Sequence, residues 1–201
     1  MKKNLNENLQ ILMPVHNEGK SLEETILKIY EVIKAKKNFS FIICEDGSND
    51  DTVEILNKLK LKYPIILLTH PFKKGYSNAV IDGIKHATAD YLLVMDSDGQ
   101  CDPKEIFKFW DNRKKADLIN GNRVPRLDFL YRQYFSNFAC FIYKFFFKVK
   151  LNDPSFAFVL TNKKVYSNLS SFKPQMPDGF FWEFNARALR KGFTFFEVNI
   201  D

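Results

Sequence analysis

Residues 91–100 read Tyr-Leu-Leu-Val-Met-Asp-Ser-Asp-Gly-Gln, an apolar run that ends abruptly in acidic and turn residues. Five apolar residues in succession are typical of a strand that is buried on both faces of a sheet. On an extended backbone, Asp96 and Asp98 stand at i and i+2 and point to the same side. Their repulsion is costly unless a cation lies between them, and Gln100 offers a third hard oxygen ligand. The alternative is an Asx-type turn with solvated carboxylates, and these ten residues leave both interpretations open.

Short apolar runs alternate with amphipathic stretches on both sides of this segment. We expect strands at 9–15, 40–44, 65–68, 91–95 and 116–120, and helices at 21–36, 52–61, 78–86 and 102–114. Ser21 and Glu24 have the spacing of a capping box that opens the first helix, and Pro103 suits the first turn of the last one. Strands that alternate with helices in this way predict an α/β sandwich on a mostly parallel sheet.

Polar clusters follow four of the expected strands, at Pro14–Glu18, Glu45–Asp50, Asp96–Gln100 and Gly121–Arg123. Ligands of such sheets bind beyond the carboxyl ends of the strands, so these clusters predict one binding site. The sequence has no G-x-G-x-x-G after the first strand and no G-x-x-x-x-G-K-[ST], which removes the usual support for dinucleotide and P-loop sites. Acidic groups at strand ends instead suit a nucleotide, with Asp46 accepting from the base and Glu18 from the ribose. Lys73, Lys74 and Arg123 are the candidate partners of phosphate oxygens.

The composition is that of one globular domain, which we expect to span residues 1–201. A net charge of +6 favours anionic partners, although a generally basic solvated surface explains it equally well. Three cysteines without C-x-x-C spacing favour a reducing compartment. We expect neither a secretory leader nor a transmembrane helix, and therefore a cytoplasmic protein. Dispersed basic residues and the absence of RRM, KH or helix-turn-helix patterns disfavour a nucleic-acid partner.

Residues 129–150 are unusually aromatic and are expected to form a helix. One arc of roughly 140° suits burial against a core and carries Tyr131, Tyr134, Phe135, Phe138, Phe141, Ile142, Phe145, Phe146 and Val149. Phe129, Tyr143 and Phe147 fall on the opposite side, among polar and basic residues. Aromatics on both faces are typical of a helix at a membrane interface. A homo-oligomer interface, or burial beneath later residues, is the alternative.

Four stretches of the sequence together resemble a family 2 glycosyltransferase with a GT-A fold, closest to the dolichyl- and polyprenyl-phosphate sugar transferases. They are residues 11–18 (Ile-Leu-Met-Pro-Val-His-Asn-Glu), 42–50 (Ile-Ile-Cys-Glu-Asp-Gly-Ser-Asn-Asp), 75–79 (Gly-Tyr-Ser-Asn-Ala) and 95–100 (Met-Asp-Ser-Asp-Gly-Gln). The resemblance covers residues 9 to about 125. It implies a Rossmann-like three-layer α/β/α sandwich, with residues 9–125 forming the half that binds nucleotide-sugar and metal, and residues 126–201 the acceptor half.

The resemblance also implies roles for individual residues. The nucleotide pocket would be lined by Pro14, His16, Glu18, Asp46, Gly75 and Asp96. The ion would be Mg²⁺ or Mn²⁺, held against the donor diphosphate by Asp96, Asp98 and Gln100. Arg123 matches an arginine that the family directs at phosphates, and Arg132 and Ser136 match residues that contact an acceptor phosphate.

The resemblance implies an inverting transfer of a sugar from a nucleotide-diphosphate-sugar, with Asp98 and Arg123 supporting departure of the diphosphate. A polyprenyl-phosphate acceptor at the cytoplasmic face of the membrane is already a nucleophile. A saccharide hydroxyl acceptor instead needs a general base, and Asp178 and Glu183 are the candidates. A third hypothesis is a non-catalytic relative that binds nucleotide without turnover.

Overall fold

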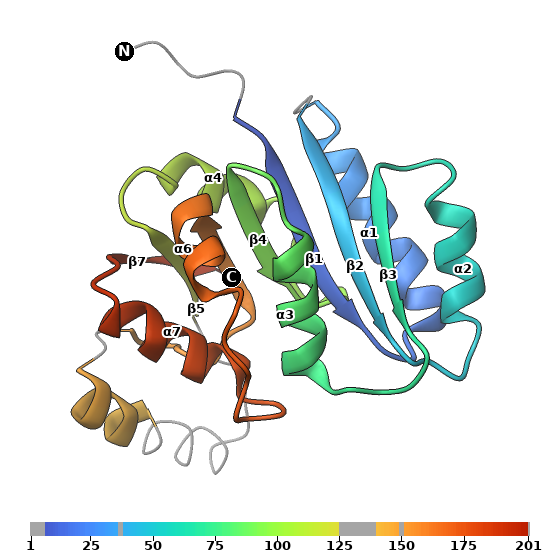
Figure 1. The fold of residues 1–201 in the computed structure, drawn as a ribbon. Helices are drawn as coiled ribbons and strands as arrows, with labels where there is room; N and C mark the ends of the chain where they lie inside the picture. Colours follow the sequence, from blue (N-terminus) through green and yellow to red (C-terminus); the bar gives the residue numbers. More distant parts are fainter. Residues whose placement is uncertain (1–6, 36–37, 125–139, 149–150, 201) are drawn as a thin grey trace.

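One sheet of seven strands runs through the part of the chain that the computed structural model describes, residues 7–35, 38–124, 140–148 and 151–200 (Figure 1). Its order is β3-β2-β1-β4-β6-β5-β7. The strands are β1 Leu9–Val15, β2 Phe39–Asp46, β3 Ile65–His70, β4 Tyr91–Met95, β5 Leu118–Arg123, β6 Phe158–Asn162 and β7 Phe195–Ile200. All neighbours pair in parallel except β6, which is antiparallel to both β4 and β5. The predicted mostly parallel sheet is therefore confirmed.

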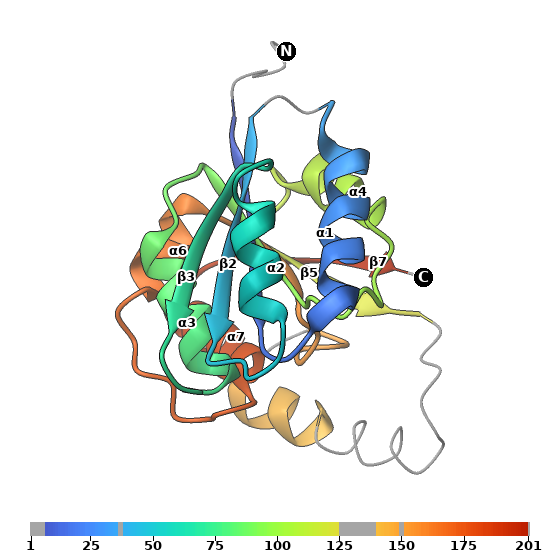
Figure 2. The ribbon, with the colours of Figure 1, turned by 90° about the vertical axis from the view of Figure 1, so that its right-hand side faces the viewer.

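Helices cover both faces of this sheet (Figures 1 and 2). One face packs against α1 Gly19–Ile33, α2 Thr52–Leu59 and α4 Glu105–Asn112. The other face packs against α3 Tyr76–His86, α6 Lys163–Leu169 and α7 Phe180–Arg190. A further helix at residues 140–147 packs beside α7. These layers confirm the three-layer α/β/α architecture.

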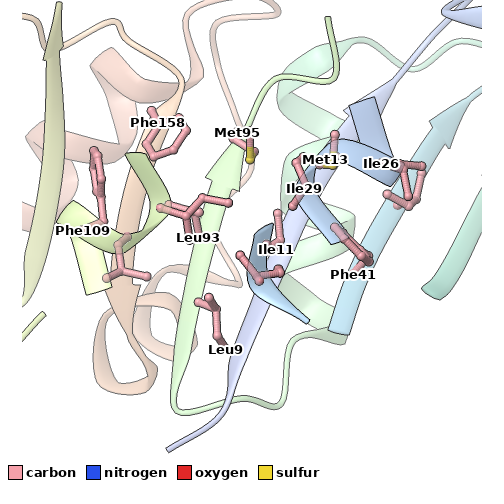
Figure 3. Packing of buried hydrophobic residues seen from close by; sticks show 14 of the residues in the cluster. Leu9, Ile11, Met13, Ile26, Ile29, Phe41, Leu93, Met95, Phe109 and Phe158 are labelled. Carbon is pink, nitrogen blue, oxygen red and sulfur yellow. The ribbon is translucent and has the colours of Figure 1, made fainter. Parts of the chain in front are cut away.

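The central strands are apolar at successive positions because each of their two faces is covered. Ile11 and Met13 of β1 lie in the same cluster as Ile26 and Ile29 of α1 (Figure 3), whereas Leu12 lies in the opposite cluster with α3. All five residues of β4 are buried, as the sequence predicts for this strand. The two cores together hold the carboxyl ends of β1, β2 and β4 at one edge.

The start of α1 differs from the predicted capping box at Ser21 and Glu24. The helix begins at Gly19, and the Ser21 hydroxyl donates to the backbone carbonyl of Glu18 instead of accepting a backbone N–H. The Thr52 hydroxyl accepts from the amides of Glu18 and Gly19, at 3.0 and 2.9 Å. The helix thus begins before Ser21, and a side chain from the next helix accepts from the amides at its start, so the capping-box prediction is wrong.

Three strands extend further towards the polar edge than the sequence indicates. β2 ends at Asp46 and β3 at His70, and these two residues are register partners. β5 ends at Arg123, which is paired with Ile200 of β7. Polar residues therefore occupy the last paired positions of the strands, which fixes their side chains more firmly than a loop would. The helix expected from 102 begins later, at Glu105.

The sheet is continuous across the two halves distinguished in the sequence. β4 of the first half pairs with β6 of the second, and Met95 is the register partner of Phe158. Since β6 is antiparallel, the residues that precede it lie at the same edge as Asp96. Among the helices of the described ranges, none is long and apolar enough to cross a membrane.

Candidate functional site

A cavity of about 320 Å³ opens at the carboxyl edge of the sheet, and we call it the edge cavity. Its described lining comes from the ends of β1, β2 and β4, from α3 and from the segment before α7: Pro14, Val15, His16, Glu18, Asp46, Lys73, Tyr76, Ala79, Asp96, Ser97, Asp98 and Asp178. Residues from five separate stretches of sequence are thus brought together. Lys73 is the one cationic Lys or Arg side chain among these lining residues.

The two aspartates after β4 line the same cavity, but the backbone conformation that places them there differs from the predicted one. β4 ends at Met95, so the backbone is not extended through Asp96 and Asp98. Asp98 is exposed and its Oδ1 accepts from the amide of Gln100 at 3.0 Å, which is the Asx-type turn. The turn and the shared cavity therefore coexist. The side chain of Gln100 is not part of the described lining of the cavity.

Asp96 lies deeper than Asp98 and accepts a hydrogen bond from the Tyr76 hydroxyl at 2.9 Å. Burial raises the pKa of Asp96 to about 6. The hydrogen bond from Tyr76 opposes this rise, while the charges of Asp98 and Glu18 add to it. Burial also raises the pKa of Glu18, with the charge of Asp98 adding to the effect. The positive charge around the cavity is thus too small to offset the burial and mutual repulsion of Asp96 and Glu18.

This donor set fits a divalent cation, because hard carboxylate oxygens are the ligands that Mg²⁺ and Mn²⁺ take. Asp96 and Asp98 are the residues that could hold it. In the described ranges, no group of three or more His, Cys, Asp or Glu side chains is arranged to hold a metal ion. Any ion would therefore need further ligands from water or from a bound diphosphate.

The end of β1 contributes His16 and Glu18 to the cavity. Nδ1 of His16 is buried and has no hydrogen-bond partner in the structure, which leaves a polar ring atom for a ligand. Glu18 is held at its backbone by Thr52. Beside them, the Ser97 hydroxyl donates to the Pro14 carbonyl at 3.1 Å and ties the end of β4 to β1 beyond their last paired residues.

Asp46, at the end of β2, accepts from three donors. Its Oδ1 accepts from His70 Nδ1 at 2.8 Å and from the Lys74 amide at 2.9 Å, and its Oδ2 accepts from the Gly75 amide at 2.8 Å. Gly75 is therefore linked to the site by its hydrogen bond to Asp46. Its φ of +92° is a backbone conformation that favours glycine. One lone pair of Oδ2 remains for a ligand.

A second cavity of about 220 Å³ adjoins the first and shares Tyr76, Asp96 and Asp178 with it. We call it the inner cavity, and its other described lining residues are Ser155, Ala157, Gly179, Phe180, Phe181 and Trp182. No Lys or Arg occurs among these lining residues. Carboxylates beside aromatic faces suit a sugar ring, whose hydroxyls donate and whose C–H faces are apolar.

Asp178 is held at this junction by contacts to α3. The Ser77 hydroxyl donates to the Met176 carbonyl at 2.6 Å, and the Ser77 amide donates to the Pro177 carbonyl at 3.1 Å. Ser77 is fully buried. The segment before α7 is thereby fixed to the helix that carries Tyr76, which places one predicted general base at the site.

The other predicted base, Glu183, lies elsewhere. Its Oε1 accepts from Arg187 at 2.6 Å, and its Oε2 accepts from the Gln175 amide at 2.8 Å. Glu183 lines a different cavity, so the structure separates it from Asp178. Its observed contacts tie α7 to the preceding segment.

Arg123, predicted to contact phosphates, forms an ion pair with Asp153 at 2.8 Å and lies over the Phe156 ring at 4.7 Å. The carboxylate of Asp153 is fully buried, whereas Arg123 is partly exposed. The positive charge of Arg123 lowers the pKa of Asp96 against the larger effect of burial, so it acts on the edge cavity. Arg132 and Ser136 lie outside the described residues.

The described part of the aromatic helix presents the opposite face to the protein from the predicted one. Tyr143 is buried, and its hydroxyl donates to the Trp182 carbonyl at 2.8 Å. Phe141, Phe145 and Phe146, which the periodicity assigns to the buried arc, are 65%, 72% and 72% exposed. That assignment is wrong because a phenol with a hydrogen-bond partner is buried in place of purely apolar rings.

An apolar groove of about 720 Å³ lies between this helix and α7, two helices that are neighbours in Figure 1. Its described lining is Ile142, Tyr143, Phe147, Gln175, Met176, Trp182, Glu183, Ala186, Arg187 and Arg190. Trp182 lines both the groove and the inner cavity. The inner cavity therefore adjoins both the edge cavity and the groove.

Several residues of these cavities were not assigned roles from the sequence. Tyr76 falls within the motif at 75–79, and its position beside Gly75 was the available signal. Ser77 and Trp182 act through contacts to residues 99 and 39 positions away, respectively. No sequence pattern reports such contacts.

Comparison with known proteins identifies several relatives. The family model described as Glycosyl transferase family 2 matches residues 10–170. The dolichol-phosphate mannosyltransferase of Pyrococcus furiosus is 33% identical over 119 residues, which is 59% of this chain and 34% of that protein. The poly-beta-1,6-N-acetyl-D-glucosamine synthase of Staphylococcus aureus is 31% identical over 124 residues, which is 60% of this chain and 29% of that protein. The chain spans about a third of the length of these curated relatives.

Solved structures share the fold at low sequence identity. The glucosyl-3-phosphoglycerate synthase of Mycobacterium tuberculosis, in complex with Mn²⁺, UDP-glucose and phosphoglyceric acid, has a TM-score of 0.74 at 12% identity, covering 96% of this chain and 70% of that one. A mannosyltransferase of Pyrobaculum calidifontis, in complex with GDP-Man and Mn²⁺, has a TM-score of 0.70 at 15% identity, covering 96% of this chain and 55% of that one.

Proposed function

Because the chain belongs to glycosyl transferase family 2, we propose that it transfers a sugar from a nucleotide-diphosphate-sugar to a polyprenyl phosphate. The transfer would invert the anomeric configuration of the sugar. The donor nucleotide would occupy the edge cavity. Asp46 and His16 would face the base, Glu18 the ribose, and Lys73 the diphosphate. Pro14 and Gly75 would shape the walls of the same pocket. The acidic lining and the single Lys support a nucleotide whose phosphates are partly neutralised by an ion.

We propose Mg²⁺ or Mn²⁺ as that ion, with Asp96 and Asp98 as its protein ligands and Gln100 as a further candidate. When bound, the ion would stabilise negative charge on the departing diphosphate as a Lewis acid. The raised pKa of Asp96 supports this assignment, because a nearby cation would offset the burial and the carboxylate repulsion that raise it. Both solved relatives described above were crystallised with Mn²⁺ and a nucleotide-sugar.

In the proposed reaction, an oxygen of the acceptor attacks the anomeric carbon on the face opposite the diphosphate. The bond between that carbon and the diphosphate oxygen breaks, and its electron pair stays with the diphosphate. An ionised phosphate acceptor needs no general base, since its oxygen is already a nucleophile. Arg123, together with Arg132 and Ser136, would contact the acceptor phosphate.

The observation that supports the lipid acceptor is the adjacency of the three cavities. The inner cavity shares Asp96 with the edge cavity and Trp182 with the apolar groove. A polar site with an apolar groove beside it suits an acceptor with a polar head and a long apolar tail. Burial of isoprenoid CH₂ and CH₃ groups in the groove stabilises the complex by about 25 cal/mol per Å². The exposed Phe141, Phe145 and Phe146 support peripheral contact with the cytoplasmic face of a membrane.

The test is an acceptor panel. Purified protein with Mn²⁺ and radiolabelled UDP-, GDP- or CDP-sugars would be offered polyprenyl phosphates or saccharides as acceptors. We expect label in the lipid phosphate, and an anomeric configuration in the product opposite to that of the donor. Transfer to saccharides alone would overturn the lipid-phosphate acceptor and leave the donor assignment in place.

The second candidate is the same donor chemistry on a saccharide hydroxyl, as in the synthesis of cell-envelope glycans. Asp178 favours it, because this carboxylate lines both the edge cavity and the inner cavity and could accept the proton of a hydroxyl. The absence of Lys and Arg from the described lining of the inner cavity favours it as well. Replacing Asp178 separates the two candidates, as argued below.

A further inference from the structure

His70 ends β3 and joins two acidic side chains. Its Nδ1 lies 2.8 Å from Asp46 Oδ1, and its Nε2 lies 3.2 Å from Asp82 Oδ2. The side chain is only 8% exposed. Asp46 ends the neighbouring strand β2, and Asp82 lies on α3. One buried ring therefore connects two strands of the sheet with the helix that follows them.

Both neighbours of the ring are acceptors of hydrogen bonds. Burial would raise the pKa of Asp46, but hydrogen bonds from His70 and the amides of Lys74 and Gly75 outweigh it and lower that pKa. Burial acts in the same direction on the pKa of Asp82, and Lys85 and Lys74 lower it. The ring therefore faces a carboxylate oxygen at each of its two nitrogens, and it is hydrogen-bonded to Asp46 through Nδ1.

The same hydrogen bonds reach the wall of the edge cavity. Asp46 holds the amides of Lys74 and Gly75, and the residues on either side of these two, Lys73 and Tyr76, line the cavity. The turn is also pressed against Gly47, where an added Cβ would lie 2.5 Å from the Lys73 amide nitrogen. The orientation of Asp46 thus controls the position of the whole turn between β3 and α3.

We infer that His70 is a positioning residue for the donor nucleotide: its bridge between Asp46 and Asp82 holds the remaining lone pair of Asp46 and the side chains of Lys73 and Tyr76 where the nucleotide binds. His70 itself does not line the cavity. The inference rests on the proposed donor site. Its consequence is expected in nucleotide binding, because the bridge acts through Asp46, which lines the edge cavity and is the proposed partner of the base.

The experiment compares His70→Gln and Asp82→Asn with His86→Gln as the matched control. His86 is an exposed histidine on the same helix as Asp82, and its Nδ1 lies 2.8 Å from the backbone carbonyl of Asp82. Glutamine can donate to Asp46 but has no second nitrogen to face Asp82, so the bridge is broken. Asp82→Asn keeps His70 and its packing while removing one of its two anions.

Binding of UDP, GDP and CDP with Mn²⁺ would be measured by calorimetry, alongside KM for the donor and kcat. We expect His70→Gln to weaken binding of the preferred nucleotide and raise the donor KM by tenfold or more, with kcat within about twofold. Asp82→Asn should weaken binding about threefold, and His86→Gln should match the wild type.

Unchanged nucleotide affinity in a folded His70→Gln would overturn the inference while leaving the donor site intact. If His70→Gln does not fold, unchanged affinity in Asp82→Asn overturns it. A loss in kcat without a change in KM would also contradict a positioning role at the nucleotide. Failure of the wild type to bind any of the nucleotides would instead overturn the donor site, and with it this inference.

Discussion

The edge cavity and the apolar groove hold their residues in different ways. In the edge cavity, polar side chains are fixed by hydrogen bonds between separate elements, such as Tyr76 to Asp96 and Ser97 to Pro14. In the groove, one buried phenol, Tyr143, anchors a helix whose other aromatic residues are largely exposed. Directional bonds fix where charge can be stabilised, whereas apolar surface only selects for size and hydrophobicity. Under the proposed function, the edge cavity would therefore determine the reaction and the groove would select the acceptor.

Removing the Asp98 carboxylate tests the proposed chemistry of the edge cavity most directly. Because this carboxylate is a proposed ion ligand, Asp98→Ala should lower turnover with nucleotide-sugar and Mn²⁺ by roughly a thousandfold or more. The measurement is initial rate, with the thermal shift produced by nucleotide and Mn²⁺ as a second readout. Asp111→Ala, at an exposed position of α4, is the matched control. Undiminished turnover in Asp98→Ala would rule out the ion assignment.

Replacing Asp178 tests the boundary between the two regions. If the acceptor is a hydroxyl, Asp178→Asn removes the general base and should lower kcat by about 10²–10⁴-fold. If the acceptor is a phosphate, the same change should alter kcat by only a fewfold, because no proton has to be removed. Measuring both acceptor classes with one variant gives the comparison directly. Glu183→Gln is the control, since Glu183 lies in the groove and is paired with Arg187.

The edge cavity could be predicted from the sequence because its residues follow from strand topology. Parallel strands end at one edge, so Glu18, Asp46 and Asp96 had to lie close together once the strands were identified. The shared cavity of Asp96 and Asp98 was correctly expected, although the reason was not: the chain turns after Met95 instead of staying extended.

The acceptor side was harder to predict because its contacts join residues far apart in the sequence. Periodicity defines the arcs of the aromatic helix but not which arc faces the protein, and the hydrogen bond from Tyr143 to Trp182 decides that. Ser77 fixes the Asp178 segment from 99 positions away. Likewise, the pairing of Arg123 with Asp153 depends on two separate elements meeting at one edge.

A smaller effect is expected on the free energy of unfolding, because the buried carboxylates of the edge cavity should destabilise the protein when no ligand is bound. Burial raises the pKa of Asp96 to about 6, so the folded protein retains a proton that the unfolded chain releases. The free energy of unfolding of the metal-free protein should therefore fall as the pH rises from about 4 to about 6. Because the pKa of Glu18 is raised as well, Asp96→Asn should reduce this slope without removing it, and should add about 3 kcal/mol at neutral pH while abolishing turnover.

Denaturant unfolding in the presence of a chelator, at several pH values, measures this effect. Asn retains an oxygen that can accept from the Tyr76 hydroxyl, so the variant isolates the charge. Adding Mn²⁺ should stabilise the wild type and not the variant. If the free energy of unfolding had the same pH dependence in both proteins, the claim that ionised Asp96 destabilises the folded protein would be wrong.

The smallest effect tests whether the exposed aromatics beside the groove contact a membrane. Phe145 and Phe146 are each 72% exposed, so Phe145→Ser with Phe146→Ser should leave the free energy of unfolding within about 0.5 kcal/mol. Partial insertion of two rings is worth at least about 1.4 kcal/mol, so cosedimentation with vesicles containing anionic lipid should fall about tenfold. Phe72→Ser is the matched control, because Phe72 is 66% exposed but lies in the segment between β3 and α3. Equal losses of vesicle binding in the double variant and in Phe72→Ser would mean that binding reflects general surface hydrophobicity. The proposal that the aromatic helix places the groove at the membrane would then be wrong.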